Sequence, residues 1–277
     1  MCRRYTTNNK TFFIETGTSV MFFIQRIGQA TQLFLAMFGR VAHFFLSTLF
    51  MAFRPPCYFK QIFKQFIQIG FFSLPVVGLT AFFTGMVLAL QSYTGFSRFQ
   101  AEGAVATVVV LSMTRELGPV LAGLMVAGRV GAAMAAEIGT MRVTEQIDAL
   151  VTLSTSPFKY LVFPRLISGL ITMPFLVLVA DSIGVFGGYL VGVYKLGFNS
   201  AMYMEQTLKF LEIQDVLSGL IKAAVFGVLI TLMGCYHGYQ SGRGAEGVGR
   251  ATTNAVVTSS IMILFMNYAL TALLFVK

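Results

Sequence analysis

The sequence predicts an all-α polytopic membrane protein with five transmembrane helices and an N-terminal interfacial helix. Hydrophobic residues make up 56% of its 277 positions and charged residues only 11%, whereas about a quarter of an ordinary soluble domain is charged. A soluble fold of this size has too little interior for so many apolar side chains, because much of any folded surface faces water. In a bilayer those side chains can face lipid, and the 27 glycines suit close helix packing.

Five segments are apolar enough to cross a bilayer, which takes about 20 residues. They are expected at about 62–93, 103–139, 160–196, 213–239 and 251–276. The first three contain Pro75, Pro119 and Pro174, which free backbone groups and permit kinks. We assign all five spans to one domain, residues 57–277.

Residues 1–56 are predicted to form a cytoplasmic segment that contains an interfacial elbow helix. The stretch Gln32–Phe53 is nearly long enough to cross, but Arg40 and His43 lie in its middle. An arginine at the bilayer centre costs about 2.5–3.5 kcal/mol on insertion scales, whereas a helix lying in the interface lets both side chains reach water. We therefore expect an interfacial helix, with a sixth span as the alternative.

The distribution of basic residues predicts the orientation. With the N-terminus inside and five spans, 13 Lys and Arg residues fall in cytoplasmic segments and four in outer segments. Basic residues are enriched on the cytoplasmic side of membrane proteins, so we expect a cytoplasmic N-terminus and a C-terminus outside. The same enrichment accounts for the formal charge of +9 without a nucleic-acid partner.

The sequence contains no recognisable metal site, cofactor site or catalytic motif. Its three cysteines are far apart and its only histidines are His43 and His237, with no recognisable metal or disulfide framework. There is no P-loop, H-E-x-x-H or G-x-S-x-G motif. Residues 242–247 match G-x-G-x-x-G, but they lie between two predicted membrane helices rather than after a strand, which predicts a cytoplasmic turn. We expect neither enzyme activity nor a cofactor.

Charged side chains inside the spans are the candidate functional residues. Arg115 and Glu116 are adjacent within the second span, and they point about 100° apart on a helix, so each needs its own polar cavity or partner helix. A helix-end ion pair near the head groups is the alternative. Lys222 either lines the same cavity or extends to the interface. Asp181 is interpreted as a satisfied polar group within the packing.

Two rows of small residues recur every four positions, a spacing that lets helix backbones approach closely. The rows are Gly123, Ala127, Gly131, Ala135 and Gly139 in the second span, and Gly184, Gly188 and Gly192 in the third. We expect at least one row to pack within a subunit, and a subunit interface is the alternative use.

The loop after the second span is predicted to form a short amphipathic helix at about residues 140–152. Its apolar positions share one helical face, and its polar positions are Arg142, Glu145, Gln146 and Asp148. The pattern alone fits a solvated connector and a docking helix for a soluble partner equally well.

A long block of this sequence is distinctive. It includes Arg115-Glu116-Leu117-Gly118-Pro119-Val120, Ala127-Gly128-Arg129, Ala136-Glu137-Ile138-Gly139-Thr140-Met141, Thr144-Glu145-Gln146 and Arg250-Ala251-Thr252-Thr253. These motifs closely resemble the MlaE/YrbE family, the membrane permease subunits of MCE-associated ABC transporters. The resemblance covers roughly Gly85 to the C-terminus and, more loosely, the N-terminal third.

The resemblance implies a homodimer in a bacterial inner membrane, with the C-terminus in the periplasm. Its implied partners are a cytoplasmic ABC ATPase, an MCE-domain lipid-binding protein on the outer face and, in many systems, a STAS-domain protein. The implied substrate is a phospholipid or related lipid. Matching cavity positions are Leu88, Phe99, Arg115, Glu116, Leu117 and Lys222, and the ATPase would dock on the helix that carries Arg142, Glu145, Gln146 and Asp148.

A basic cavity above apolar walls suits a lipid with an anionic head group, so we expect Arg115 and Lys222 to hold that head group. Two other functions fit the residues less well. One is an ion-driven secondary transporter in which Asp181 or Glu116 carries a proton. The other is a membrane scaffold that moves no substrate.

Overall fold

The computed structural model describes residues 28–29, 31–32, 35–51, 58–101 and 103–275. The chain divides into two units, Met1–Ser47 and Thr48–Lys277. An apolar helix, Leu35–Met51, occupies most of the predicted elbow segment. Its location in the interface, rather than across the bilayer, stays a prediction. The remainder of the predicted cytoplasmic segment falls almost wholly outside the described residues.

Five helical segments are long and apolar enough to cross a membrane, which confirms the predicted polytopic fold. They are Phe59–Phe96, Ala104–Val143, Phe158–Lys195, Ile213–Tyr239 and Gly244–Leu274. Each begins or ends within a few residues of its predicted span, except that the last begins at Gly244 instead of residue 251. The described residues contain no strand.

Most of these segments are built from several helices. The first consists of α2 (Phe59–Ile69), η1 (Phe71–Ser73) and α3 (Leu74–Phe96), followed by η2 (Ser97–Phe99). The second consists of α4 (Ala104–Ser112), η3 (Met113–Leu117), α5 (Gly118–Val126), η4 (Ala127–Gly131) and α6 (Ala132–Val143). The third consists of η5 (Phe158–Val162), α8 (Phe163–Leu190) and η6 (Val191–Lys195). The fourth and fifth are α10 (Ile213–Tyr239) and α11 (Gly244–Phe275).

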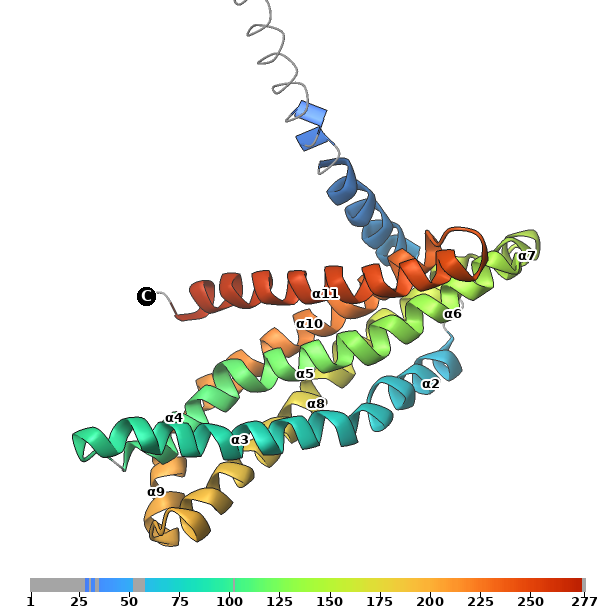
Figure 1. The fold of residues 1–277 in the computed structure, drawn as a ribbon. Coiled ribbons are helices and arrows are strands. Elements are labelled where there is room, and N and C mark those ends of the chain that lie inside the picture. Colours follow the sequence, from blue (N-terminus) through green and yellow to red (C-terminus); the bar gives the residue numbers. More distant parts are fainter. Residues whose placement is uncertain (1–27, 30, 33–34, 52–57, 102, 276–277) are drawn as a thin grey trace, which may run out of the picture. The chain divides into compact units, whose positions relative to one another are not determined.

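Two short helices connect the spans at opposite ends of the bundle. Helix α7 (Gln146–Thr152) follows the second span, and α9 (Ser200–Phe210) follows the third. Figure 1 shows α7 at the same end as the turn between α10 and α11, whereas α9 lies at the end where α3 turns into α4. With the predicted orientation, α7 lies at the cytoplasmic end and α9 at the outer end.

Glycines set the close approach between the spans. A Cβ atom at Gly85 in α3 would overlap the carbonyl of Gly184 in α8, and a Cβ at Gly227 in α10 would overlap the carbonyl of Gly169 in α8. Backbone therefore packs on backbone at both crossings, which only glycine permits. The predicted row that begins at Gly184 thus packs within the chain, as expected.

The other predicted row also faces helices of the same chain. A Cβ at Gly123 would contact Phe226 in α10 and Ile263 in α11, and one at Gly131 would contact Ile230. These contacts are part of a core in which Phe226, Ile230 and Ile263 are fully buried. Neither row of glycines is therefore left open for a subunit interface at these positions.

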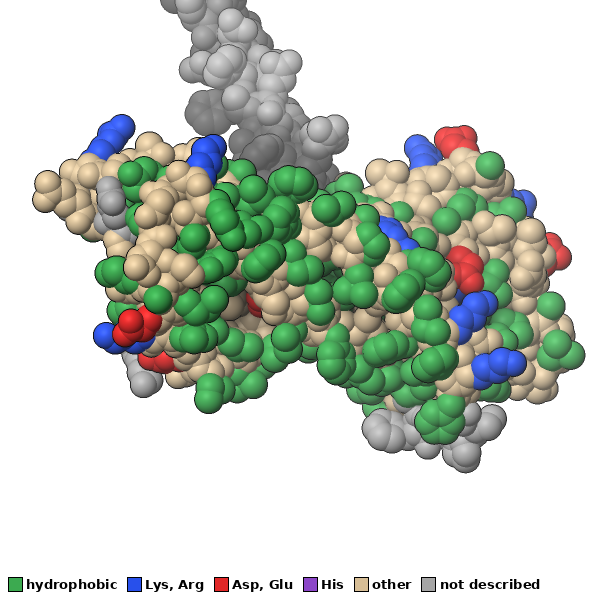
Figure 2. All heavy atoms as spheres, turned by 90° about the horizontal axis from the view of Figure 1, so that it is seen from below, with side chains coloured by type: hydrophobic (Ala, Val, Ile, Leu, Met, Phe, Trp, Pro, Cys, Tyr) green, Lys and Arg blue, Asp and Glu red, His purple; other side chains and the backbone are tan. Residues whose placement is uncertain are grey.

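The outer surface of the bundle is strongly apolar. Figure 2 shows hydrophobic side chains across the middle of one face, with most Lys, Arg, Asp and Glu toward its two ends. Helix α11 is the span least covered by its own chain. Its exposed apolar side chains include Val257, Ile261, Leu264, Phe265 and Tyr268. A surface of this kind is stable in lipid or against another apolar surface.

Candidate functional site

The candidate site forms where the second span widens into the π-helical turn η3, which carries Arg115 and Glu116. Pro119 follows in the next turn and has no N–H to donate to the carbonyl of Arg115, four residues earlier. That carbonyl accepts a hydrogen bond from Lys222 Nζ at 2.8 Å. A proline in the sequence thus frees a backbone acceptor within the span, and a lysine from α10 satisfies it.

Arg115 binds the first turn of α10. Its Nε lies 2.7 Å from Asp215 Oδ1, and its Nη2 lies 2.6 Å from the same oxygen. The Asp215 side chain is only 1% exposed. Asp215 also accepts a hydrogen bond from the backbone N–H of Glu212 in a capping box. One carboxylate therefore caps α10 and fixes it to η3.

Glu116 binds two other helices. Its carboxylate accepts a hydrogen bond from Lys222 Nζ in α10 at 2.8 Å. It also accepts from Asn267 Nδ2 at 2.8 Å and from Thr271 Oγ1 at 3.0 Å, both in α11. The adjacent residues Arg115 and Glu116 are therefore not paired with each other. Each contacts partner helices instead: Arg115 binds α10, and Glu116 binds both α10 and α11.

We call these six residues the η3 network: Arg115, Glu116, Asp215, Lys222, Asn267 and Thr271. It contains two cations and two anions, so its formal charge is zero, which is compatible with burial in a membrane span. The side chains of Arg115 and Glu116 remain 37% and 38% exposed. The network therefore presents one charge of each sign on an otherwise apolar surface.

The position of the Lys222 side chain does not fit the role in the cavity that was predicted for it. Its side chain is fully buried, and its ammonium group already binds the carboxylate of Glu116 and the carbonyl of Arg115. It has no exposed surface with which to contact a head group. Its two contacts hold Glu116 in place and join η3 to α10.

Asp181 lies beside this network without joining it. A Cβ at Gly118 would overlap Asp181 Oδ1, so the glycine is needed for the carboxyl group to fit. Asp181 is 8% exposed, and its Oδ1 has no hydrogen-bond partner. The predicted satisfied polar group is therefore wrong for this oxygen, because none of the described groups packed around it donates a hydrogen bond to it.

The remaining cavity candidates lie on the helices around η3. Leu88 in α3 and Leu117 in η3 are half-buried and pack against the main hydrophobic core. Phe99 is the last residue of η2, and its side chain is outside the described part of the structure. Leu117 thus directly follows Glu116 in η3, whereas Leu88 lies on the first span at the edge of the hydrophobic core.

The predicted docking helix is shorter than expected. Residues up to Val143 belong to α6. The helix is interrupted at Glu145, which has a left-handed φ of 59°. Helix α7 starts only at Gln146. The helix was predicted too long because the helical spacing of its apolar residues continues across the bend at Glu145. The break is bridged by an ion pair of 2.8 Å between Arg142 Nη1 and Asp148 Oδ1.

The four predicted docking residues therefore divide into two groups. Arg142 and Asp148 stabilise the bend between α6 and α7, and Arg142 also lies over the ring of Tyr239 at 5.9 Å. Glu145 and Gln146 are exposed at the bend. Arg142 and Asp148 are exposed as well, so all four side chains are accessible at this end of the bundle.

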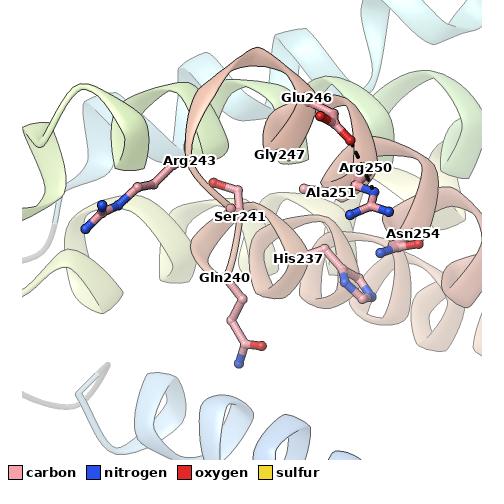
Figure 3. A pocket seen from close by; sticks show the side chains of 10 residues that line it. His237, Gln240, Ser241, Arg243, Glu246, Gly247, Arg250, Ala251 and Asn254 are labelled. Atoms are coloured by element: carbon pink, nitrogen blue, oxygen red, sulfur yellow. Dashed lines mark ion pairs between the residues drawn. The ribbon is translucent and has the colours of Figure 1, made fainter.

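The predicted turn at residues 242–247 is shorter than expected: only residues 242–243 lie between α10 and α11, and residues 244–247 form the first turn of α11. It borders an open pocket of about 370 Å³ that includes His237, Arg250 and Asn254. Figure 3 shows Arg243 pointing away from these three side chains. A helix precedes the turn and another follows it, so the βαβ context of a dinucleotide site is missing from this part of the structure.

Three members of the η3 network were not predicted from the sequence. Asp215 was identifiable as the third helical residue after Glu212, which is capping-box spacing. Asn267 and Thr271 are four residues apart in an apolar run, so they share one face of a helix. Such spacing identifies a polar face, but it does not identify Glu116 as the group that this face contacts.

The sequence was compared with known families and proteins. Residues 62–273 match the family described as Permease MlaE. A probable ABC transporter permease protein of Rickettsia bellii is 64% identical over 249 residues, covering 90% of this chain and 96% of that protein.

Two more distant relatives carry more specific names. The intermembrane phospholipid transport system permease protein MlaE of Haemophilus influenzae is 36% identical over 91% of this chain and 97% of its own length. The chloroplastic protein TRIGALACTOSYLDIACYLGLYCEROL 1 of Arabidopsis thaliana is 35% identical over 79% of this chain and 62% of its own length. Because the family match includes all five spans and these relatives align over most of the chain, the protein belongs to the MlaE permease family.

Proposed function

We propose that this chain is the membrane permease subunit of an ABC transporter that moves phospholipids, or related lipids, between the inner membrane and an MCE-domain carrier. Membership of the MlaE family and the name of the Haemophilus relative, an intermembrane phospholipid transport permease, support this proposal. ATP hydrolysis is assigned to a separate cytoplasmic ATPase, and a STAS-domain protein is a further expected partner. Family membership also favours this function over an ion-driven transporter or a scaffold.

The observation that carries the proposal is the partial exposure of Arg115 and Glu116 within an apolar span. A phospholipid has an anionic phosphate and two apolar chains, so its binding site needs a basic group beside apolar walls. Arg115 supplies the basic group, and we assign Leu88, Phe99 and Leu117 to the walls. Lys222 and Glu116 hold η3 in position, because their contacts join it to α10 and α11.

The role of Arg115 can be tested without leaving a buried charge unpaired. Arg115→Gln combined with Asp215→Asn removes both charges of the pair, which is much less destabilising than removing one. We expect the assembled transporter to retain about tenfold less co-purifying phospholipid, because one charge-assisted contact is worth about 1.5–3 kcal/mol. Lys209→Gln on the exposed surface of α9 is the control. Normal lipid retention in the double variant would assign the pair a purely structural role.

We further infer that two copies of the chain form the transporter core, with an inner-membrane location, a cytoplasmic N-terminus and a periplasmic C-terminus. The excess of basic residues in the predicted inner segments supports this orientation. The exposed apolar side of α11 supports a dimer, because Val257, Ile261 and Tyr268 lie on one side of the helix least covered by its own chain.

Glu145 is proposed to contact the ATPase at the bend before α7. The backbone there is left-handed, so Glu145→Gly should relieve about 1 kcal/mol of strain while removing the carboxylate. We expect weaker ATPase association despite unchanged or higher thermal stability, and a larger loss for Glu145→Lys. Pull-down of the ATPase and lipid-stimulated ATP hydrolysis measure this, with Glu205→Lys on α9 as control. Full association of both Glu145 variants would place the docking contact elsewhere.

A further inference from the structure

A second polar pocket lies at the opposite end of the spans from the η3 network. It opens between α2, the end of α6 and the start of the third span, and its volume is about 190 Å³. We call it the basal pocket and define it by Gln61, Lys64, Gln65, Glu137, Tyr160 and Arg165. Glu137 lies about 30 Å along the second span from Glu116, given a helical rise of about 1.5 Å per residue. The two sites are therefore separate.

Arg165 is the main reason to expect a ligand here. Its side chain is 2% exposed, its Nη2 lies 2.8 Å from Glu137 Oε2, and its Nη1 donates to the carbonyl of Leu161 at 3.4 Å. Its Nε has no hydrogen-bond partner. The buried thiol of Cys235 lies beside the guanidinium, but a thiol is only a weak acceptor. A buried guanidinium with an unfilled donor favours a nearby anion.

The other polar groups of the basal pocket are mostly donors. Lys64 adds a second cation, so the pocket carries a net formal charge of +1 after Glu137 is counted. The side-chain nitrogen of Gln61 donates to Tyr160 Oη at 2.8 Å, which leaves the phenol proton available for a ligand oxygen. A phosphate group, with several acceptor oxygens and a negative charge, matches this set of donors.

The surface next to the pocket is apolar. Phe59, Phe63 and Ile67 are exposed on α2 and recur every four residues, so they form one stripe along the helix. A hydrogen bond of 2.9 Å from Ser168 Oγ in α8 to the carbonyl of Ile62 holds α2 against the third span. Lys64, which lines the pocket, directly follows Phe63 in the sequence. The stripe and the pocket therefore lie on the same short helix.

We propose that the basal pocket binds the phosphate of a phospholipid in the cytoplasmic leaflet, whose acyl chains lie along Phe59, Phe63 and Ile67. The phosphate is held by Lys64, Tyr160 and Arg165. The apolar stripe is the reason to assign a lipid phosphate rather than free phosphate to this site. The assignment does not depend on transport, since it concerns residues remote from the η3 network.

The test uses the full-length chain in nanodiscs of phosphatidylcholine that contain a photoreactive phosphatidylglycerol with a diazirine on its acyl chain. Cross-linking to the peptide that spans residues 59–69 is measured by mass spectrometry. We expect Lys64→Gln to lower the yield about tenfold, equivalent to about 1.4 kcal/mol. Lys60→Gln, one turn earlier on the same helix and outside the pocket, should leave it nearly unchanged. Both lysines are exposed, so neither variant should impair folding.

Two further measurements identify the ligand. A diacylglycerol probe with the same diazirine but no phosphate should label the peptide weakly and independently of Lys64. Inorganic phosphate, added at constant ionic strength, should not displace the phosphatidylglycerol probe. Equal labelling of the Lys64→Gln and Lys60→Gln variants, or equal labelling by the two probes, would overturn the proposal. Displacement by inorganic phosphate would overturn the lipid assignment and make this a site for free phosphate.

Discussion

Lys222→Met is expected to destabilise the folded chain by about 3 kcal/mol and to abolish lipid retention. The substitution removes the cation that binds Glu116 and the donor that binds the carbonyl of Arg115. Removing one partner of a buried ion pair costs about 3–5 kcal/mol, and the partial exposure of Glu116 places the effect near the lower limit. Thermal unfolding of the purified chain, followed by circular dichroism, measures the change.

A double variant separates stability from function. Lys222→Met with Glu116→Gln removes both charges, which is often nearly neutral for a buried pair, so most of the stability should return. Lipid retention should stay low, because η3 keeps only one of its two ionic links to α10, that between Arg115 and Asp215. Lys209→Met, on the exposed surface of α9, is the control for the loss of a lysine. Unfolding of Lys222→Met at the parent temperature would show that the buried ion pair does not stabilise the fold.

Gly85→Val is expected to disrupt the packing of the first span on the third. A Cβ at this position would overlap the carbonyl of Gly184, and a backbone atom cannot rotate away as a side chain can. Overpacked cores lose about 1–3 kcal/mol, occasionally more, and we expect at least the upper end because α3 and α8 must separate along their length. The expected result is low yield of folded protein and a strongly lowered unfolding temperature.

The matched control for this substitution is on the same helix. Gly95→Val places the same side chain in α3 where no atom lies within 4 Å of the new Cβ. Both substitutions replace a helical glycine by the same β-branched residue, so their difference isolates the contact with Gly184. Similar unfolding temperatures for the two variants would mean that α3 and α8 do not pack through Gly85 in the membrane.

The sequence by itself determined the architecture of the spans. Length and continuity of apolar runs located all five, because a bilayer-spanning helix satisfies its own backbone and needs no information about its neighbours. The four-residue spacing around Gly184 likewise identified a packing face. The adjacent charged residues Arg115 and Glu116 were identified for a similar reason. A charge inside a span requires a partner wherever the helices lie.

The tertiary structure alone decided which partners those residues have. Asp215, Asn267 and Thr271 lie on α10 and α11, at least 100 positions away in the sequence from the charges they bind. Their pairing depends on the crossing of three helices and on the wider turn at η3, neither of which has a local pattern. The same crossing buries Lys222, which the sequence suggested for the cavity.

Two other features of the structure also have no local pattern in the sequence. The sequence indicated no partner for Arg165, but it lies buried against Glu137 at the start of the third span. The predicted helix at about 140–152 is interrupted at Glu145, although its apolar spacing continues. Hydrophobic periodicity indicates which side chains along one element avoid water. The burial of Arg165 and the bend at Glu145 depend on the free energy of contacts between elements. They are therefore determined only when the helices pack.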